Sequence, residues 1–139
     1  MAQGYTLLDH TADLRIRVAG VDRADLFKNA GLALFDLISP LGAMESAEAI
    51  ELDVTGDDPA DLMVNFLREL LYLWAGREKL VTDITLSHIS DTALSARVFS
   101  VDFQPQRHAI LHEIKAVTYH RIDVGPALDG WRAEVVFDV

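Results

Sequence analysis

The chain has 139 residues, of which 50% are hydrophobic, and its 12 basic and 22 acidic side chains give a formal net charge of −10. This length and apolar fraction are typical of one folded domain and exclude an intrinsically disordered chain. Because the sequence contains no cysteine, it also excludes disulfides, thiolate zinc sites and cysteine nucleophiles.

The first half of the chain predicts two strands and two helices. Apolar and basic residues alternate over 14–18, and apolar and acidic residues alternate over 50–54, as in half-buried strands. Between them, Asp22 can cap a helix with apolar residues at helical spacing, which Ser39 and the following proline end.

A second, longer helix is predicted after Asp58 and Pro59, since aspartate caps free amides and proline is tolerated in a first helical turn. We expect this helix to end at Gly76. Its broad apolar stripe favours a core element and consists of Met63, Phe66, Leu67, Leu70, Leu71 and Trp74.

The second half of the chain predicts strands. The hairpin-sized connection 90–92 separates the first two of them, and a turn over 125–130 precedes the last. The expected strands are 81–89, 93–101, 114–124 and 131–139. We therefore predict an α+β fold in a single domain over residues 1–139, with two main helices packed on mostly antiparallel β-sheet. These patterns do not determine the order of the strands.

The basic side chains are scattered singly along the sequence. Binding to a phosphate backbone needs lysines and arginines that displace counterions together, so we expect no direct contact with RNA or DNA. An acidic surface suits cations or a basic protein partner, and a solvated face is the simpler alternative. We also expect a cytoplasmic protein without membrane contact, since no secretory signal and no apolar run of roughly 20 residues is visible.

The first candidate functional cluster is the segment 9–13, which holds Asp9, His10 and Asp13 just before the first predicted strand. Two carboxylates and an imidazole within five positions can bind a cation. Aspartate and threonine are also common turn residues, because they bond local backbone amides. Both interpretations remain open on these residues alone.

The second cluster is the segment 114–120, where Lys115 lies among apolar residues. An alternating strand would place Lys115, Val117 and Tyr119 on one face. A lysine in that setting either meets an anion or discourages aggregation as a charge on an edge strand.

The third cluster is the end of the sequence, where Asp138 precedes Val139 and its α-carboxylate. If Asp13, Asp138 and the terminal carboxylate converge, they repel one another unless a cation or Lys115 lies between them. Hard divalent cations prefer such oxygen ligands. A frayed chain end is the competing interpretation.

These clusters, in this order, resemble the archease family along almost the whole chain. The helix entry with Gly56, Asp57, Asp58, Asp61 and Leu62 is similar as well. The other segments that carry the resemblance are Leu8-Asp9-His10-Thr11-Ala12-Asp13, Ile114-Lys115-Ala116-Val117-Thr118-Tyr119-His120 and Phe137-Asp138-Val139.

The resemblance implies an accessory protein and not an enzyme. Archeases activate the GTP-dependent RNA ligase of the RtcB type in tRNA splicing and RNA repair, promote its guanylylation and support multiple turnover. RNA is then reached only through the ligase. The family implies a divalent-cation site at Asp13 and Asp138, to which we add Val139, with Ca²⁺ the first candidate and Mg²⁺ or Mn²⁺ the alternatives. Lys115 is expected to contact the partner or a phosphate, and Asp9 and His10 to bind the cation or lie beside it.

The sequence departs from the archease pattern at one place, and it leaves two alternative functions. Where the family often has a glycine-glutamate pair, this chain has Ser100 and Val101, followed by Asp102. The missing carboxylate weakens the cation site or alters the partner contact unless Asp102 substitutes for it. The alternative functions are a metal-dependent hydrolase, in which His10 and His112 help to activate water, and a chaperone-like interaction module, which needs exposed apolar surface.

Overall fold

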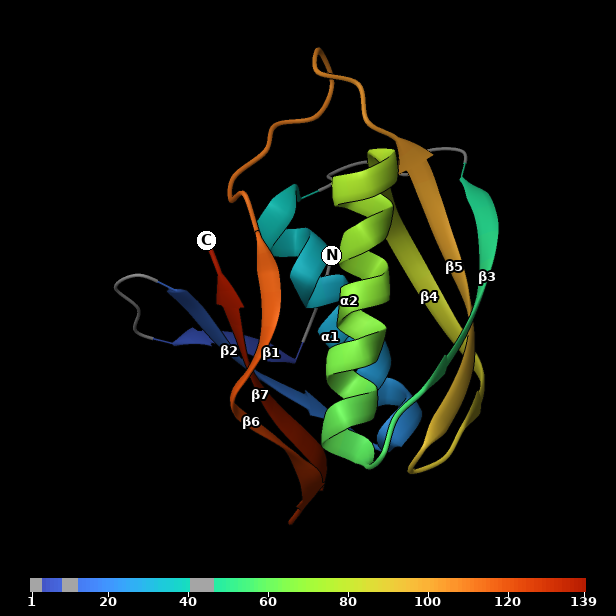
Figure 1. The fold of residues 1–139 in the computed structure, drawn as a ribbon, viewed down its shortest axis with the longest axis vertical. Coiled ribbons are helices and arrows are strands. Elements are labelled where there is room, and N and C mark those ends of the chain that lie inside the picture. The colour runs from blue at the N-terminus through green and yellow to red at the C-terminus, as the bar shows by residue number, and fades with distance from the viewer. Residues whose placement is uncertain (1–3, 9–12, 41–46) are drawn as a thin grey trace.

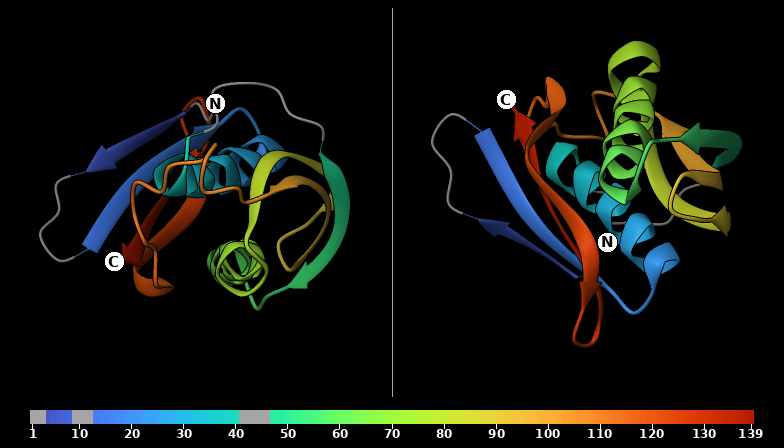
Figure 2. Two further views of the ribbon diagram at one scale, coloured as in Figure 1. Left: turned by 90° about the horizontal axis from the view of Figure 1, so that it is seen from above. Right: turned by 60° about the horizontal axis from the view of Figure 1, so that its bottom comes forward.

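The computed structural model describes residues 4–8, 13–40 and 47–139. Two antiparallel sheets enclose a middle layer of two helices (Figures 1 and 2). One sheet has four strands in the order β1-β2-β7-β6, and the other has three in the order β3-β5-β4. The predicted α+β class is therefore confirmed. The elements are β1 (Tyr5–Leu8), β2 (Asp13–Gly20), α1 (Arg23–Ile38), β3 (Glu48–Thr55), α2 (Pro59–Arg77), β4 (Lys79–Ile89), β5 (Ala93–Asp102), β6 (Ala116–Ala127) and β7 (Gly130–Asp138).

The helices lie between the sheets and contact both of them. Helix α1 packs on β2 and β4, and α2 packs on β6 as well as on β3 and β4. A helix covered from two sides needs apolar residues around much of its circumference, which explains the broad stripe on α2. At the centre, the rings of Phe27 and Phe66 have centroids 6.0 Å apart, and both side chains are fully buried. The two sheets therefore share one core.

Both helices begin where the sequence predicts. The Asp22 side chain accepts a hydrogen bond from the backbone N–H of Asp25 at 2.8 Å, and Asp58 accepts one from that of Asp61 at 2.8 Å. Each cap satisfies an amide that has no partner inside its helix. Within the described ranges, no helix combines the length and hydropathy needed to cross a membrane.

The prediction that α2 ends at Gly76 is wrong. The helix continues to Arg77, and Glu78 takes the left-handed conformation with φ 53°. The backbone N–H of Glu78 bonds to the carbonyls of Leu73 and Trp74. Glycine favours this cap because it has no Cβ, but here a glutamate adopts it and the glycine stays helical.

Two differences concern the four-stranded sheet. The edge strand β1 was not predicted, because four residues are too short to show a period. Strand β6 begins at Ala116, after Lys115, and its pairing with β7 shifts between Thr118 and Asp123. This bulge interrupts the period of two, so the predicted alternation through the segment 114–120 is wrong.

Candidate functional site

The strand register brings two predicted cation ligands together. Strand β2 pairs antiparallel with β7, and Asp13 is the direct partner of Asp138. On the other side of β7, Asp138 is the partner of Ala116 in β6. The end of β7 is therefore hydrogen-bonded between two strands, and it does not fray before Asp138.

The two carboxylates lie on the same side of the sheet. Directly opposite residues of an antiparallel pair share a face, with Cβ atoms roughly 4.5–5.5 Å apart. Their neighbours Leu14 and Phe137 are also partners of one another and are buried against the core. Side chains alternate along strands, so Asp13 and Asp138 lie on the outer face. Like charges directly opposite destabilise a sheet, and a cation between them removes that cost.

Lys115 reaches this end of the sheet through its backbone. Its N–H donates a 2.8 Å hydrogen bond to the carbonyl oxygen of Asp138. The lysine precedes β6, and both Ile114 and Val117 are buried on either side of it. The Lys115 side chain is exposed, next to the last residues of β7.

The ligand set of the predicted cation site is incomplete in the described part of the chain. Asp9 and His10 lie outside the described residues. Within the ranges 4–8, 13–40 and 47–139, no group of three or more histidine, aspartate or glutamate side chains is arranged to hold a metal ion. Asp13 and Asp138 supply two carboxylates at adjacent strand positions, and the cation itself stays a prediction.

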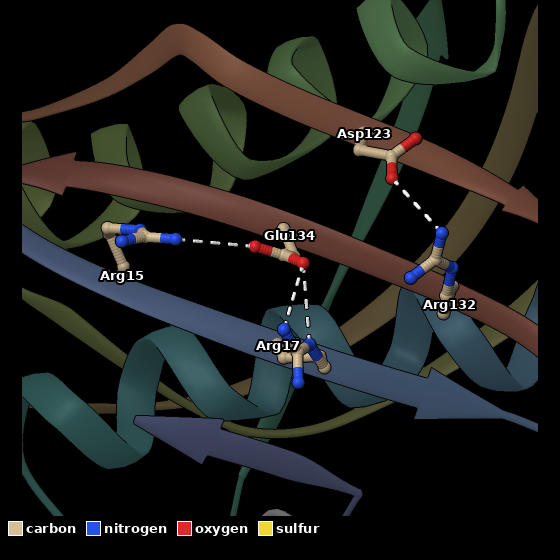
Figure 3. A network of polar contacts seen from close by, with 5 residues as sticks. All are labelled: Arg15, Arg17, Asp123, Arg132 and Glu134. Atoms are coloured by element: carbon tan, nitrogen blue, oxygen red, sulfur yellow. Dashed lines mark hydrogen bonds and ion pairs between the residues drawn. The ribbon is translucent and has the colours of Figure 1, made fainter. Parts of the chain in front are cut away.

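A polar network that the sequence analysis did not anticipate covers the middle of the same outer face (Figure 3). Glu134 pairs with Arg15 at 3.6 Å and with Arg17 at 3.2 Å, and Arg132 pairs with Asp123 at 3.6 Å. Exposed pairs of this kind contribute little to stability. They keep this face of the sheet polar beside the aspartate pair.

Two segments that carry the family resemblance meet at the β6 edge of the four-stranded sheet. The Tyr119 hydroxyl in β6 donates a 2.6 Å hydrogen bond to Asp61 in the first turn of α2. Arg68 lies over the Tyr119 ring, 4.8 Å from its centroid, and its Nε donates to the carbonyl of Val117 at 3.1 Å. The bond from Tyr119 lowers the pKa of Asp61 and raises the pKa of Tyr119. These contacts hold β6, and with it the segment that begins at Lys115, against α2.

The opposite edge strand is attached in a similar way. Tyr5 in β1 donates a 2.5 Å hydrogen bond to Asp36 in α1. Burial, followed by the hydrogen bond and the charge of Asp36, raises the pKa of Tyr5 to about 12. A tyrosine-aspartate hydrogen bond therefore ties each edge of the four-stranded sheet to a different helix. Sequence reasoning missed both, because no local pattern pairs residues so far apart.

The substitute carboxylate Asp102 has a partner at the end of the three-stranded sheet. Its side chain and that of Glu48 both bind the Lys79 ammonium, each at 2.5 Å. The preceding Ser100 and Val101 are buried. In this chain Ser100 and Val101 are therefore part of the buried interior, and Asp102 forms an ion pair within the three-stranded sheet.

Comparisons with known proteins match one family over almost the whole chain. The model of the archease protein family matches residues 5–139. Archeases of Methanosarcina acetivorans and Pyrococcus furiosus are each 33% identical, over 97% and 94% of this chain and 95% of each relative. The solved structure of protein 1598 of Methanobacterium thermoautotrophicum superposes with a TM-score of 0.80 at 25% identity, covering 98% of this chain and 99% of that one. A Thermotoga maritima archease, named a possible chaperone, shares the fold with a TM-score of 0.61 at 19% identity over 95% of this chain and 94% of its own.

Proposed function

The chain belongs to the archease family, and we propose that it is a cation-binding accessory protein of a GTP-dependent RNA ligase of the RtcB type. In this role it promotes guanylylation of the ligase and supports repeated turnover in tRNA splicing and RNA repair, in the cytoplasm. It catalyses no reaction alone. The observation that carries the proposal is the pairing of Asp13 with Asp138.

The aspartate pair supports a cation-dependent role because its placement is costly without one. Two carboxylates directly opposite each other repel, and a divalent cation turns that repulsion into binding energy. Ca²⁺ suits flexible oxygen ligands, and Mg²⁺ and Mn²⁺ are the alternatives. The carboxylate of Val139 follows Asp138 directly, and Asp9 and His10 precede Asp13 closely in sequence. We assign these groups to complete the site.

The charge of the chain supports a protein partner over a nucleic acid. A ligase that holds RNA, GTP and metal ions needs a basic cleft, and a chain with a net charge of −10 is attracted to such a cleft. RNA is then contacted only through the ligase. Lys115, which is joined to Asp138 through its backbone, is placed to bind a phosphate or to orient a carboxylate there.

The test is guanylylation of the RtcB-type ligase from the same organism, measured with substoichiometric amounts of this protein. We expect Asp13→Ala and Asp138→Ala to lose the stimulation, because each removes one of the facing carboxylates. Asp129→Ala is the matched control, since Asp129 is exposed in the turn between β6 and β7. If Asp13→Ala and Asp138→Ala both stimulate like the wild type, the assigned site is wrong.

The same assay identifies the ion. Because the ligase holds metal ions of its own, the measured quantity is the difference between guanylylation with and without this protein. We expect Ca²⁺ to support that difference at a lower concentration than Mg²⁺ or Mn²⁺ does, and Asp138→Ala to abolish the dependence. The name of the Thermotoga relative suggests a second candidate, a chaperone. Suppression of the aggregation of unrelated proteins, with no need for a cation, would favour it over ligase activation.

A further inference from the structure

The connection between β5 and β6 carries an unusual run of exposed apolar residues. Ala109, Ile110 and Leu111 follow one another, and all three are exposed. Ile110 is 36% exposed and Leu111 is 59% exposed. Leu111 above all leaves apolar surface outside the packing of the fold, and an exposed apolar run beside a functional site is a candidate for contact with a partner.

The backbone that bears this run is fixed on both sides. Before it, the N–H groups of Arg107 and His108 bond to the carbonyl of Gln104, each at 2.9 Å, and the N–H of Gln104 bonds to Nδ1 of the buried His108 at 2.9 Å. The N–H of Leu111 bonds to the carbonyl of Ile38 at the end of α1, at 2.8 Å. A loop held in this way loses little conformational entropy when a partner binds it.

The run also lies close to the aspartate pair. The connection arches over the top of the molecule in Figure 1, and the part that leads into β6 comes down beside the C-terminus (Figures 1 and 2). Lys115 bonds to Asp138, and four residues of chain extend at most about 14 Å, which bounds the distance from Leu111 to Lys115. A partner that covers Asp13 and Asp138 with an interface of ordinary size, about 800 Å² on each side, can therefore reach Ile110 and Leu111 as well.

We propose that Ile110 and Leu111 are the apolar anchor by which this protein docks on the ligase, in a pocket at the margin of its basic cleft. This inference rests on the proposed function. A basic protein is the occupant that charge favours, because two copies of a chain with a net charge of −10 repel each other. Anchors of this kind dominate interface energies when a pocket desolvates them.

The chain supplies its own matched control at the turn between β6 and β7. There Pro126, Ala127 and Leu128 are also exposed, and Leu128 is fully solvated. This turn lies at the far end of β7 from Asp138, about 27 Å away along the strand at roughly 3.4 Å per residue. Leu128 is therefore the exposed leucine on the side of the sheet away from the aspartate pair, which makes it the control.

The experiment measures ligase guanylylation against the concentration of wild-type, Leu111→Ser and Leu128→Ser protein. Burial of one leucine predicts a roughly 10- to 100-fold higher half-maximal concentration for Leu111→Ser, with the same maximum. Leu128→Ser should match the wild type. Because both leucines are exposed, both variants should fold. Melting curves that match those of the wild type, with and without Ca²⁺, verify this.

The outcomes separate the docking role from the proposed function. If Leu111→Ser and the double variant with Ile110→Ser stimulate at the wild-type concentration, the docking role is wrong and ligase activation stands. An equal loss in Leu128→Ser also overturns it, since the effect is then not local to this loop. A wild-type protein that does not stimulate the ligase at all contradicts the proposed function and the docking role with it.

Discussion

The three-stranded sheet and the end of the four-stranded sheet arrange their charged residues in opposite ways. In the three-stranded sheet, acidic residues face basic ones. Glu51 is the register partner of Arg97 and accepts its Nε–H at 3.0 Å, and Asp102 is the partner of Lys79 and binds its ammonium. At the end of the four-stranded sheet, Asp13 faces Asp138 instead. A facing pair of like charges does not stabilise a sheet. Asp123 and Glu134 also face each other, but each of them pairs with an arginine. The end of the four-stranded sheet is therefore where the proposed cation would act.

The shared core shows that this difference is not one of packing. Helix α1 contacts strands of both sheets, and so does α2. Apart from Val136 in β7, the buried apolar residues of both sheets join a single cluster around the helices. The sheets therefore gain stability together, and only their outer faces differ in charge.

The largest effect is expected from Phe66→Ala, which should lower the free energy of unfolding by about 3–5 kcal/mol. Phe66 is fully buried and packs on Phe27 in the layer between the sheets. Guanidinium unfolding measures this loss. When unfolding is followed in single-tryptophan variants, Trp74 reports on α2 and Trp131 on β7, and we expect the two transitions to coincide. Separate transitions would show that the two sheets do not form one cooperative unit.

The next effect is stabilisation by the cation. At a Ca²⁺ concentration about 100 times its dissociation constant, the free energy of unfolding should rise by about 2.7 kcal/mol. Asp138→Asn should remove this gain, while Asp102→Asn at the end of the three-stranded sheet should keep it. Calorimetric melting with Ca²⁺ and with chelator measures both. A gain that survives in Asp138→Asn would place the ion elsewhere.

A smaller effect tests the like-charge pair in the absence of a cation. In chelator, Asp13→Asn should raise the free energy of unfolding by about 0.2–1 kcal/mol, because it relieves the repulsion from Asp138. Glu51→Gln should leave it unchanged or lower it by up to about 1 kcal/mol, because its pair with Arg97 is exposed. Denaturant titration gives the sign of the change in the free energy of unfolding for each variant. A loss of stability in Asp13→Asn would contradict the repulsion.

The smallest effect concerns the edge of the four-stranded sheet at alkaline pH. The folded protein raises the pKa of Tyr5 to about 12, above the value of about 10 in an unfolded chain. The stability that Tyr5 contributes is therefore present below pH about 10 and is lost as the pH rises towards 12. Tyr5→Phe should flatten this part of the stability profile, as measured by urea unfolding at a series of pH values. An unchanged slope would show that the fold does not raise the pKa of Tyr5.

The sequence predicted most elements because their signals are local. The caps Asp22 and Asp58 act within one helical turn. Prediction failed where a neighbour far along the chain decided the outcome. The register shift in β6 includes Tyr119, whose hydroxyl bonds to Asp61 in α2, and β1 is a strand because it pairs with β2.

By itself, the sequence determined the α+β class, the helix starts, the excess of acidic charge and the resemblance to archeases, since all of these are written in short patterns and in composition. Only the tertiary structure decided that Asp13 faces Asp138, that Tyr119 meets Asp61, and that Leu111 is left exposed. The physical reason is register. Strands from the two ends of the chain find their pairing through the burial of their inner faces against the helices, and that pairing then fixes which charges meet on the outer face.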